Sequence, residues 1–248
     1  MELFDQIRRL GDVHGIDHIG VAEISRYKSE IESLGGKLAG NYPRAVSIGI
    51  VLPKNIVDLL ENRDSYENVL QYRHHAYDVI NARLDAFSSL ISSVIYKSGY
   101  QAMPLPAAER IDKTRICASV SHKIPARLAG FGWIGKSCLL INPVHGPRVR
   151  WTTVLTDAPL AANEILAESR CGNCSRCAEI CPAHAIKNRN FIDHEPREQR
   201  LNAEKCEAYF EELKAQNKLE VCGLCLYVCP YGRRKAGEPA SSGRQSPV

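Results

Sequence analysis

The chain has 248 residues, of which 44% are hydrophobic and 24% charged, as in an ordinary globular protein. Its net charge of +4 is too small to make nucleic acid an expected partner, and no apolar run approaches the roughly 18 residues that a membrane span needs. The N-terminal stretch MELFDQIRRLGDVHG has charges of both signs and no apolar signal-peptide core, which predicts a cytoplasmic protein.

Helical and extended patterns alternate through the first part of the chain. The spacing of apolar residues predicts a helix from Glu2 to about Val13. Residues 55–98 contain neither Gly nor Pro and repeat apolar residues at helical spacing, which predicts one long amphipathic helix that ends at Gly99. Strands are expected at 18–22, 45–52, 100–103, 138–141 and 152–156.

This interleaving of helices and strands predicts an α/β sandwich over residues 1–160. An Ala-rich link then leads into a cysteine-rich module over residues 161–235. Residues 236–248 contain almost nothing to bury, so a disordered tail is expected there. The predicted fold class is α+β, a sandwich followed by a small two-cluster module of the ferredoxin type.

Eight of the ten cysteines lie between Cys171 and Cys229. In a chain without a secretion signal, such clustering indicates metal binding rather than disulfides. A C-x2-C-x2-C-x3-C-P motif begins at Cys171 and a C-x2-C-x3-C-P motif at Cys222, with Cys206 isolated between them. In ferredoxins the short loop supplies thiolates to one [4Fe–4S] cluster, while the Cys before Pro ligates the other cluster.

Crossed ligation of this kind leaves the second cluster one ligand short, because the symmetric position is Leu219. Cys206 is the nearby spare cysteine and takes that role. Zinc is the competing interpretation, although zinc sites need neither a three-cysteine loop nor Pro after the last Cys of both motifs. The predicted ligands are Cys171, Cys174, Cys177 and Cys229 for cluster 1, and Cys181, Cys206, Cys222 and Cys225 for cluster 2.

The sequence GFGWIGKS at residues 130–137 matches both G-x-G-x-x-G and the P-loop pattern. A P-loop follows a buried strand and opens a helix. Here residues 124–129 look helical and residues 139–143 look like a strand, so the context argues against nucleotide binding. The glycines would instead allow close backbone approach, either to a flat cofactor or to packed neighbours.

Together these motifs resemble the epoxyqueuosine reductase family and the related reductive dehalogenases. The similarity is carried by AGFGWIGK at 129–136, LLIN at 139–142 and both cysteine motifs, and it spans most of residues 1–232. It implies a nitroreductase-like, cobalamin-binding α/β domain and two [4Fe–4S] clusters that pass low-potential electrons to the cobalt. A ferredoxin or flavodoxin would be the donor, and a small molecule or a corrinoid protein would be the substrate.

The same resemblance suggests where a cofactor is bound. His122 is the candidate proton donor, since its ordinary pKa lies near 6.5, and the alternative is a polar loop histidine held by hydrogen bonds. Two lysines could meet an anionic group such as a cofactor phosphate, or could be plain surface residues. The candidate cofactor-binding residues are Ser121, Lys123, Gly130, Gly132, Trp133, Gly135 and Lys136.

Two departures from the family pattern bear on the substrate. The queuosine enzymes carry Asp-Ser-x-Pro-x-x-Glu-Arg upstream of the glycine loop, whereas residues 116–123 here are ICASVSHK, without the carboxylate that looks like the proton donor. The helical-repeat region that helps to hold transfer RNA is also absent, so a substrate other than epoxyqueuosine is expected. Three functions stay open: a cobalamin-dependent reductase, an electron-transfer protein with FMN or no cofactor in its first domain, and an ATP-using activator.

Overall fold

The computed structural model describes residues 2–110, 112, 114–164 and 168–233. Its centre is a four-stranded sheet in the order β1-β2-β6-β3, in which neighbouring strands are antiparallel. β2 and β6 are buried along almost their whole length, which explains their nearly continuous apolar or threonine-rich sequences. The strands are β1 (His18–Glu23), β2 (Arg44–Val51), β3 (Ala102–Leu105) and β6 (Val149–Thr156).

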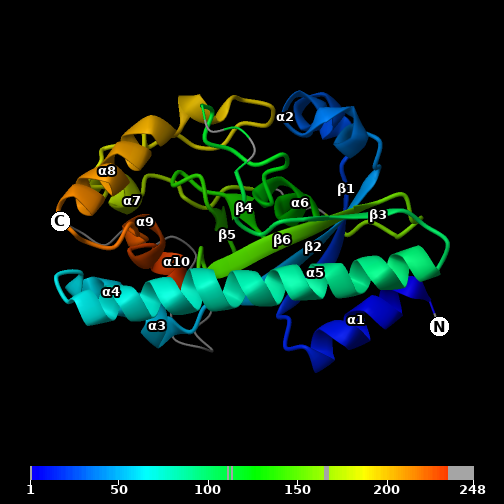
Figure 1. Cartoon of the computed structure of the whole chain (residues 1–248). Coiled ribbons are helices and arrows are strands. Elements are labelled where there is room, and N and C mark those ends of the chain that lie inside the picture. Colours follow the sequence, from blue (N-terminus) through cyan, green and yellow to red (C-terminus); the bar gives the residue numbers. More distant parts are fainter. Residues whose placement is uncertain (1, 111, 113, 165–167, 234–248) are drawn as a thin grey trace.

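One face of the sheet is covered by α1 (Leu3–Val13) and α5 (Ile80–Lys97), as Figure 1 shows. The prediction of a single helix over 55–98 is wrong for its first part. A new helix begins after Ser65, which caps it by accepting a hydrogen bond from the backbone N–H of Asn68 at 3.3 Å. Before this cap lie α3 (Lys54–Asp58) and η2 (Leu59–Asn62), and after it α4 (Tyr66–Arg73) and the π-helical η3 (His74–Val79) lead into α5.

The opposite face of the sheet carries α2 (Lys28–Gly40), α6 (Lys123–Leu128) and a two-stranded ladder (Figure 1). The ladder pairs β4 (Trp133–Ile134) with β5 (Leu140–Ile141). Leu128 of α6 packs in a second core with Ala22 and Leu155 of the sheet. Helices on both faces of one sheet confirm the predicted sandwich.

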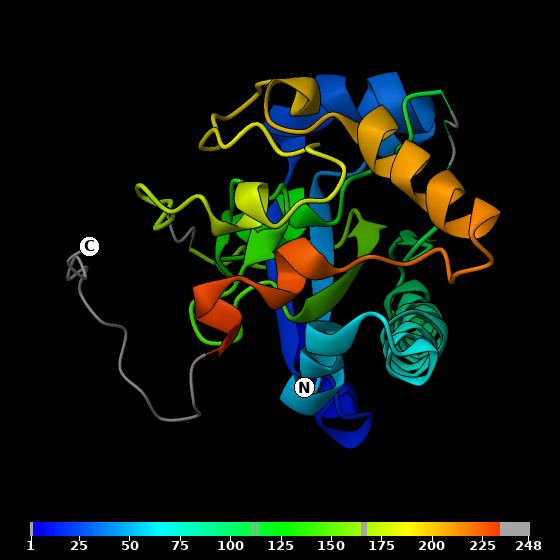
Figure 2. The same cartoon turned by 90° about the vertical axis from the view of Figure 1, so that its left-hand side faces the viewer.

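The cysteine-rich module folds back onto the long helical segment rather than extending away from it (Figures 1 and 2). Val221 and Leu226 are buried in the same core as Leu84 of α5, so the two parts share apolar packing. The boundary at residue 160 stays a prediction. The helical elements of the module are α7 (Arg176–Glu179), η4 (Arg197–Gln199), α8 (Ala203–Ala215), α9 (Leu224–Tyr227) and α10 (Pro230–Arg233).

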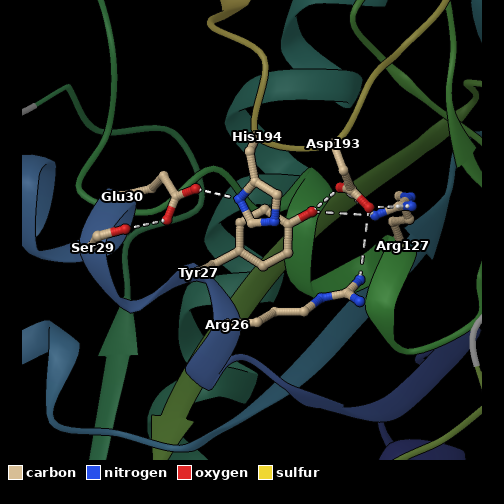
Figure 3. Close-up of polar contacts among 7 residues, drawn as sticks. All are labelled: Arg26, Tyr27, Ser29, Glu30, Arg127, Asp193 and His194. Carbon is tan, nitrogen blue, oxygen red and sulfur yellow. Dashed lines mark hydrogen bonds and ion pairs between the residues drawn. The ribbon is translucent and has the colours of Figure 1, made fainter.

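A polar network also joins the module to the sheet domain (Figure 3). Arg127 of α6 donates two hydrogen bonds, of 2.9 and 3.0 Å, to the carboxylate of Asp193, which also accepts one from the hydroxyl of Tyr27. The Tyr27 ring stacks on His194 with centroids 4.7 Å apart, and His194 pairs with Glu30 of α2. Because these contacts join three separate elements, they set where the 188–196 loop lies on the sheet domain.

The predicted tail at residues 236–248 lies outside the described residues, as does the part of the Ala-rich link at 165–167. Among the helices of the described ranges, none combines the length and apolar character required to cross a bilayer.

Candidate functional site

Eight cysteines of the module gather in two adjacent groups. In the first group the charges of Cys171 and Cys174 act on Cys177, and those of Cys171 and Cys177 act on Cys229. Burial, followed by these neighbouring thiols, raises the pKa of Cys177 to about 11 and contributes to a pKa of about 12 for Cys229. All four thiols line one pocket, which Cys225 of the second group also lines. These are the four cysteines that the sequence predicted for cluster 1.

The second group contains the cysteine that had no counterpart in the repeated motif. Burial raises the pKa of Cys206 to about 11, and the charges of Cys222 and Cys181 add to this effect. Burial raises the pKa of Cys225 further, and the charges of Cys222 and Cys206 add to this effect. Cys206 reaches the group from the first turn of α8, whose N-cap Asn202 accepts a hydrogen bond from the backbone N–H of Lys205 at 3.0 Å.

Two sets of four sulfur donors fit two [4Fe–4S] clusters. Without iron the crowded, half-buried thiols are stabilised in the protonated form, since each thiolate would repel the others in a low-dielectric setting. Iron ions remove this penalty because thiolates are the form that ligates metal. In the described part of the chain, no three His, Cys, Asp or Glu side chains could share a single metal ion. The ligand assignment itself stays a proposal.

The sulfur groups receive hydrogen bonds from residues outside the module. Trp133 Nε1 donates to Cys171 Sγ at 3.4 Å, and Lys136 Nζ donates to the carbonyl of Cys174 at 3.1 Å. These two members of the predicted cofactor-binding set therefore lie against the first sulfur group. At the second group, Arg63 donates to Cys222 Sγ at 3.3 Å. Sequence reasoning missed Arg63, because nothing in its local sequence links it to a cysteine 159 residues away.

The glycines of the 130–135 loop are required by packed neighbours. Gly130 has φ +82°, and a Cβ there would lie 2.4 Å from the carbonyl oxygen of Glu164. Gly132 has φ +151°, and its Cβ would lie 2.1 Å from the carbonyl oxygen of Ile141. A Cβ on Gly135 would meet Cys171 Sγ at 3.4 Å. The loop follows helix α6, contains the short strand β4 and precedes strand β5, which confirms the order that argued against a P-loop.

Two hydrogen bonds hold His122 in place. This agrees with the alternative interpretation from the sequence, a polar loop histidine held by hydrogen bonds. Its Nε2 lies 3.0 Å from the carbonyl of Pro106, which can only accept, so Nε2 carries the proton. Its Nδ1 therefore accepts from the hydroxyl of Thr153 at 2.9 Å. Burial lowers the pKa of His122 to about 4, which keeps the ring neutral and leaves the proton-donor role without support from this geometry. The neighbouring Ser121 is exposed.

Tyr77, Arg150 and His122 form a row of electrostatically interacting side chains that starts at the second sulfur group. Tyr77 lies on the π-helical η3, a rare element that often occurs at functional positions, and the charges of Cys225 and Cys222 act on its hydroxyl. The guanidinium of Arg150 lies over the Tyr77 ring at 4.5 Å, and its charge also lowers the pKa of His122. Tyr77 and Arg150 were not predicted, because only the tertiary structure brings η3 and β6 together.

The edge of β6 beside this row has no strand partner within the described ranges. β3 pairs with β6 only from Thr153 to Thr156, whereas β6 begins at Val149. Residues 149–152 therefore pair with β2 on one side and have no strand partner among the described residues on the other.

Comparison with known proteins agrees with this arrangement. Residues 170–232 match the family model of the 4Fe-4S double cluster binding domain. An epoxyqueuosine reductase of Cyclobacterium marinum is 27% identical over 92% of this chain and 78% of its own length. One of Pseudomonas aeruginosa is 29% identical over 63% of this chain, which spans only 41% of that relative.

Solved structures share the fold over almost the whole chain. The catabolic reductive dehalogenase NpRdhA superposes with a TM-score of 0.69 at 22% identity, over 92% of this chain and 31% of its own. An epoxyqueuosine reductase in complex with an epoxyqueuosine-modified tRNA-Tyr stem loop gives a TM-score of 0.61 at 20% identity, over 93% and 65% of the two chains. The predicted resemblance to epoxyqueuosine reductases and reductive dehalogenases is therefore confirmed, for a chain whose module is a 4Fe-4S double cluster binding domain.

Proposed function

We propose that this protein is a corrinoid-dependent iron–sulfur oxidoreductase. The single observation that carries the proposal is the electrostatic row from Cys222 through Tyr77 and Arg150 to His122, beside the part of β6 that β3 does not pair with. A solved reductive dehalogenase of the same fold, with a TM-score of 0.68, is B12-dependent.

The residues along this row fit the lining of a cofactor site, because they are largely surrounded by protein and still partly exposed to solvent. Burial is the main cause of the altered pKa of Tyr77, His122 and Lys123, yet each of these residues retains partial exposure. We infer that the corrinoid binds beside these half-buried side chains.

When bound, the clusters supply single low-potential electrons and the corrinoid supplies a cobalt centre that reduces an organic substrate. The chain itself holds the clusters through its eight thiolates and donates hydrogen bonds to them from Trp133 and Arg63. Tyr77 and Arg150 would lie between the second cluster and the bound corrinoid. His122 contributes a fixed, neutral imidazole.

Anaerobic reconstitution with iron, sulfide and hydroxocobalamin, followed by desalting and ultraviolet–visible spectroscopy, tests the proposal. We expect about eight irons per chain and a retained corrinoid band, as two four-iron clusters and one cofactor require. His122→Trp should block the proposed corrinoid site and abolish corrinoid retention while leaving the iron count unchanged. Val13→Trp, at a residue that is 81% exposed, is the matched control. Eight irons without any retained corrinoid would refute the corrinoid assignment.

A second candidate is an electron-transfer protein whose clusters serve a partner. It is favoured by the position of the first sulfur group, whose pocket is also lined by Lys136, Arg170 and Arg176. Arg170 and Arg176 are exposed. This basic rim fits a small acidic electron carrier such as a ferredoxin or flavodoxin, whose negative surface would be attracted to it. Under the corrinoid proposal the same rim receives the electron donor.

A further inference from the structure

Lys136 is a buried cation beside the first sulfur group. From the sequence it could meet an anionic group or lie on the surface, and the structure leaves only 7% of it exposed. Its ammonium donates a hydrogen bond to the carbonyl of Cys174 at 3.1 Å. None of the ion pairs among the described residues includes Lys136. An ammonium carries three N–H donors and is costly to bury without a counter-charge, so this position calls for an anion.

Two backbone hydrogen bonds fix where Lys136 lies. The N–H of Gly135 donates to the carbonyl of Leu139 at 2.9 Å, and the N–H of Cys138 donates to the carbonyl of Gly135 at 2.9 Å. These bonds close a tight turn between β4 and β5. The turn packs against the first sulfur group, since a Cβ on Gly135 would lie only 3.4 Å from Cys171 Sγ. Lys136 therefore reaches the sulfur group from a hydrogen-bonded turn of the sheet domain.

The pocket that Lys136 lines combines thiols with positive charge. All four thiols of the first sulfur group line it, and it holds about 420 Å³ of space that protein atoms do not fill, part of it open to solvent. Two further cations of the lining, Arg170 and Arg176, are exposed. Among the described residues that line the pocket, none is Asp or Glu. The pocket therefore has room for an anion, and its lining supplies no carboxylate to Lys136.

A [4Fe–4S] cluster at the first sulfur group is an anion of the kind that Lys136 lacks. Four thiolates carry more negative charge than the iron–sulfide core carries positive charge, so the liganded cluster is anionic. Reduction adds one further negative charge, and a nearby buried cation therefore stabilises the reduced cluster more than the oxidised one. Net charge and hydrogen bonds around a cluster are among the factors that set its reduction potential.

We propose that Lys136 is the counter-cation of cluster 1 and raises its reduction potential. The proposal rests on the cluster 1 ligands of the proposed function and is independent of the corrinoid. Arg170 and Arg176 line the same pocket, but solvent screens their exposed charges, so they should affect the potential less. The P-loop-like sequence thereby has a role that needs no nucleotide: Gly135 permits the close approach to Cys171, and Lys136 supplies the charge.

Redox titration of the reconstituted protein, followed by electron paramagnetic resonance, tests this role. At the midpoint potential of wild-type cluster 1, Lys136→Met should lower the ratio of reduced to oxidised cluster 1 at least tenfold, a negative shift of about 59 mV for a one-electron couple. The matched control is Arg176→Met, which removes an exposed charge from the same pocket and should give a clearly smaller shift. The potential that moves should be the one that Arg63→Gln moves less, because Arg63 contacts the second sulfur group.

Lys136→Gln separates the charge from the hydrogen bond, because its amide can still donate to the carbonyl of Cys174. We expect the same negative shift as in Lys136→Met. A wild-type potential in Lys136→Gln, or a shift in Lys136→Met no larger than that of the control, overturns the proposal. If both neutral variants lose cluster 1, Lys136→Arg decides: retention of about eight irons supports the charge, and loss overturns it. The corrinoid assignment fails separately, through eight irons without retained corrinoid in the wild type, and the potential of cluster 1 still decides the role of Lys136.

Discussion

The hydrogen bond from Arg63 to the second sulfur group gives a prediction for a reduction potential. The guanidinium donates to Cys222 Sγ at 3.3 Å and to the carbonyl of Val221 at 3.0 Å, which keeps its charge beside the proposed cluster 2. Reduction adds one negative charge to a cluster, and a neighbouring cation stabilises that charge. Arg63→Gln should therefore lower the reduction potential of cluster 2.

The size of the shift follows from Coulomb's law. The added electron is shared across the cluster, so its charge lies roughly 6 Å from the guanidinium, and an effective dielectric constant of about 20 makes the attraction worth about 3 kcal/mol. Arg63 is only half-buried, and solvent screening should halve this energy. Since about 1.4 kcal/mol corresponds to about 59 mV for a one-electron couple, the expected shift is on the order of 60 mV.

Redox titration of the reconstituted protein, followed by electron paramagnetic resonance, measures both potentials separately. Arg63→Lys keeps the charge and should shift cluster 2 much less than Arg63→Gln. Trp133→Phe removes a neutral donor to Cys171 and should move cluster 1 by a smaller amount, because hydrogen bonds from charged groups are the stronger ones. An unchanged cluster 2 potential in Arg63→Gln, at full iron content, would refute this reasoning.

Three more predictions concern ligation, backbone packing and pH. Cys206→Ala should reduce the iron content from about eight to about four per chain, whereas the control Cys117→Ala should keep all eight. An iron content of about eight in Cys206→Ala would show that Cys206 is not a ligand. Gly132→Ala should lower the free energy of unfolding by at least about 2 kcal/mol, against about 1 kcal/mol for Gly99→Ala, where φ is also positive but nothing lies within 4 Å. Because burial holds the pKa of His122 at about 4, below its ordinary 6.5, the unfolded chain takes up a proton that the folded chain does not. The free energy of unfolding should therefore fall as the pH drops from about 6.5 toward 4, and this fall should be smaller in His122→Gln. Urea unfolding at pH 7 and pH 5.5 measures the fall for both proteins. The same fall in the wild type and in His122→Gln would contradict the assignment.

The local pattern of the sequence was sufficient for most elements and for the grouping of the cysteines. Alternation and helical spacing predicted the strands near His18 and Ala45 and the helix that ends before Gly99, because these signals depend on neighbours within a few residues. The predicted role of Cys206 followed from counting donors, and in the structure the charges of Cys222 and Cys181 act on its thiol. The same reasoning missed the break before Tyr66, since an N-cap at Ser65 is a weak signal inside a strongly helical stretch.

The surroundings of the sulfur groups and of His122 depend on the tertiary structure. Arg63 and Cys222 are separated by 159 residues, and Tyr77 and Arg150 come from elements on different parts of the chain. No local rule connects such residues, because their contact follows from how the helices, the sheet and the module pack. The sequence by itself determined that the chain carries eight grouped cysteines beside a glycine-rich loop on an α/β sandwich. Only packing decided which charges and donors face them, because burial and distance, and not residue type alone, set the strength of each interaction.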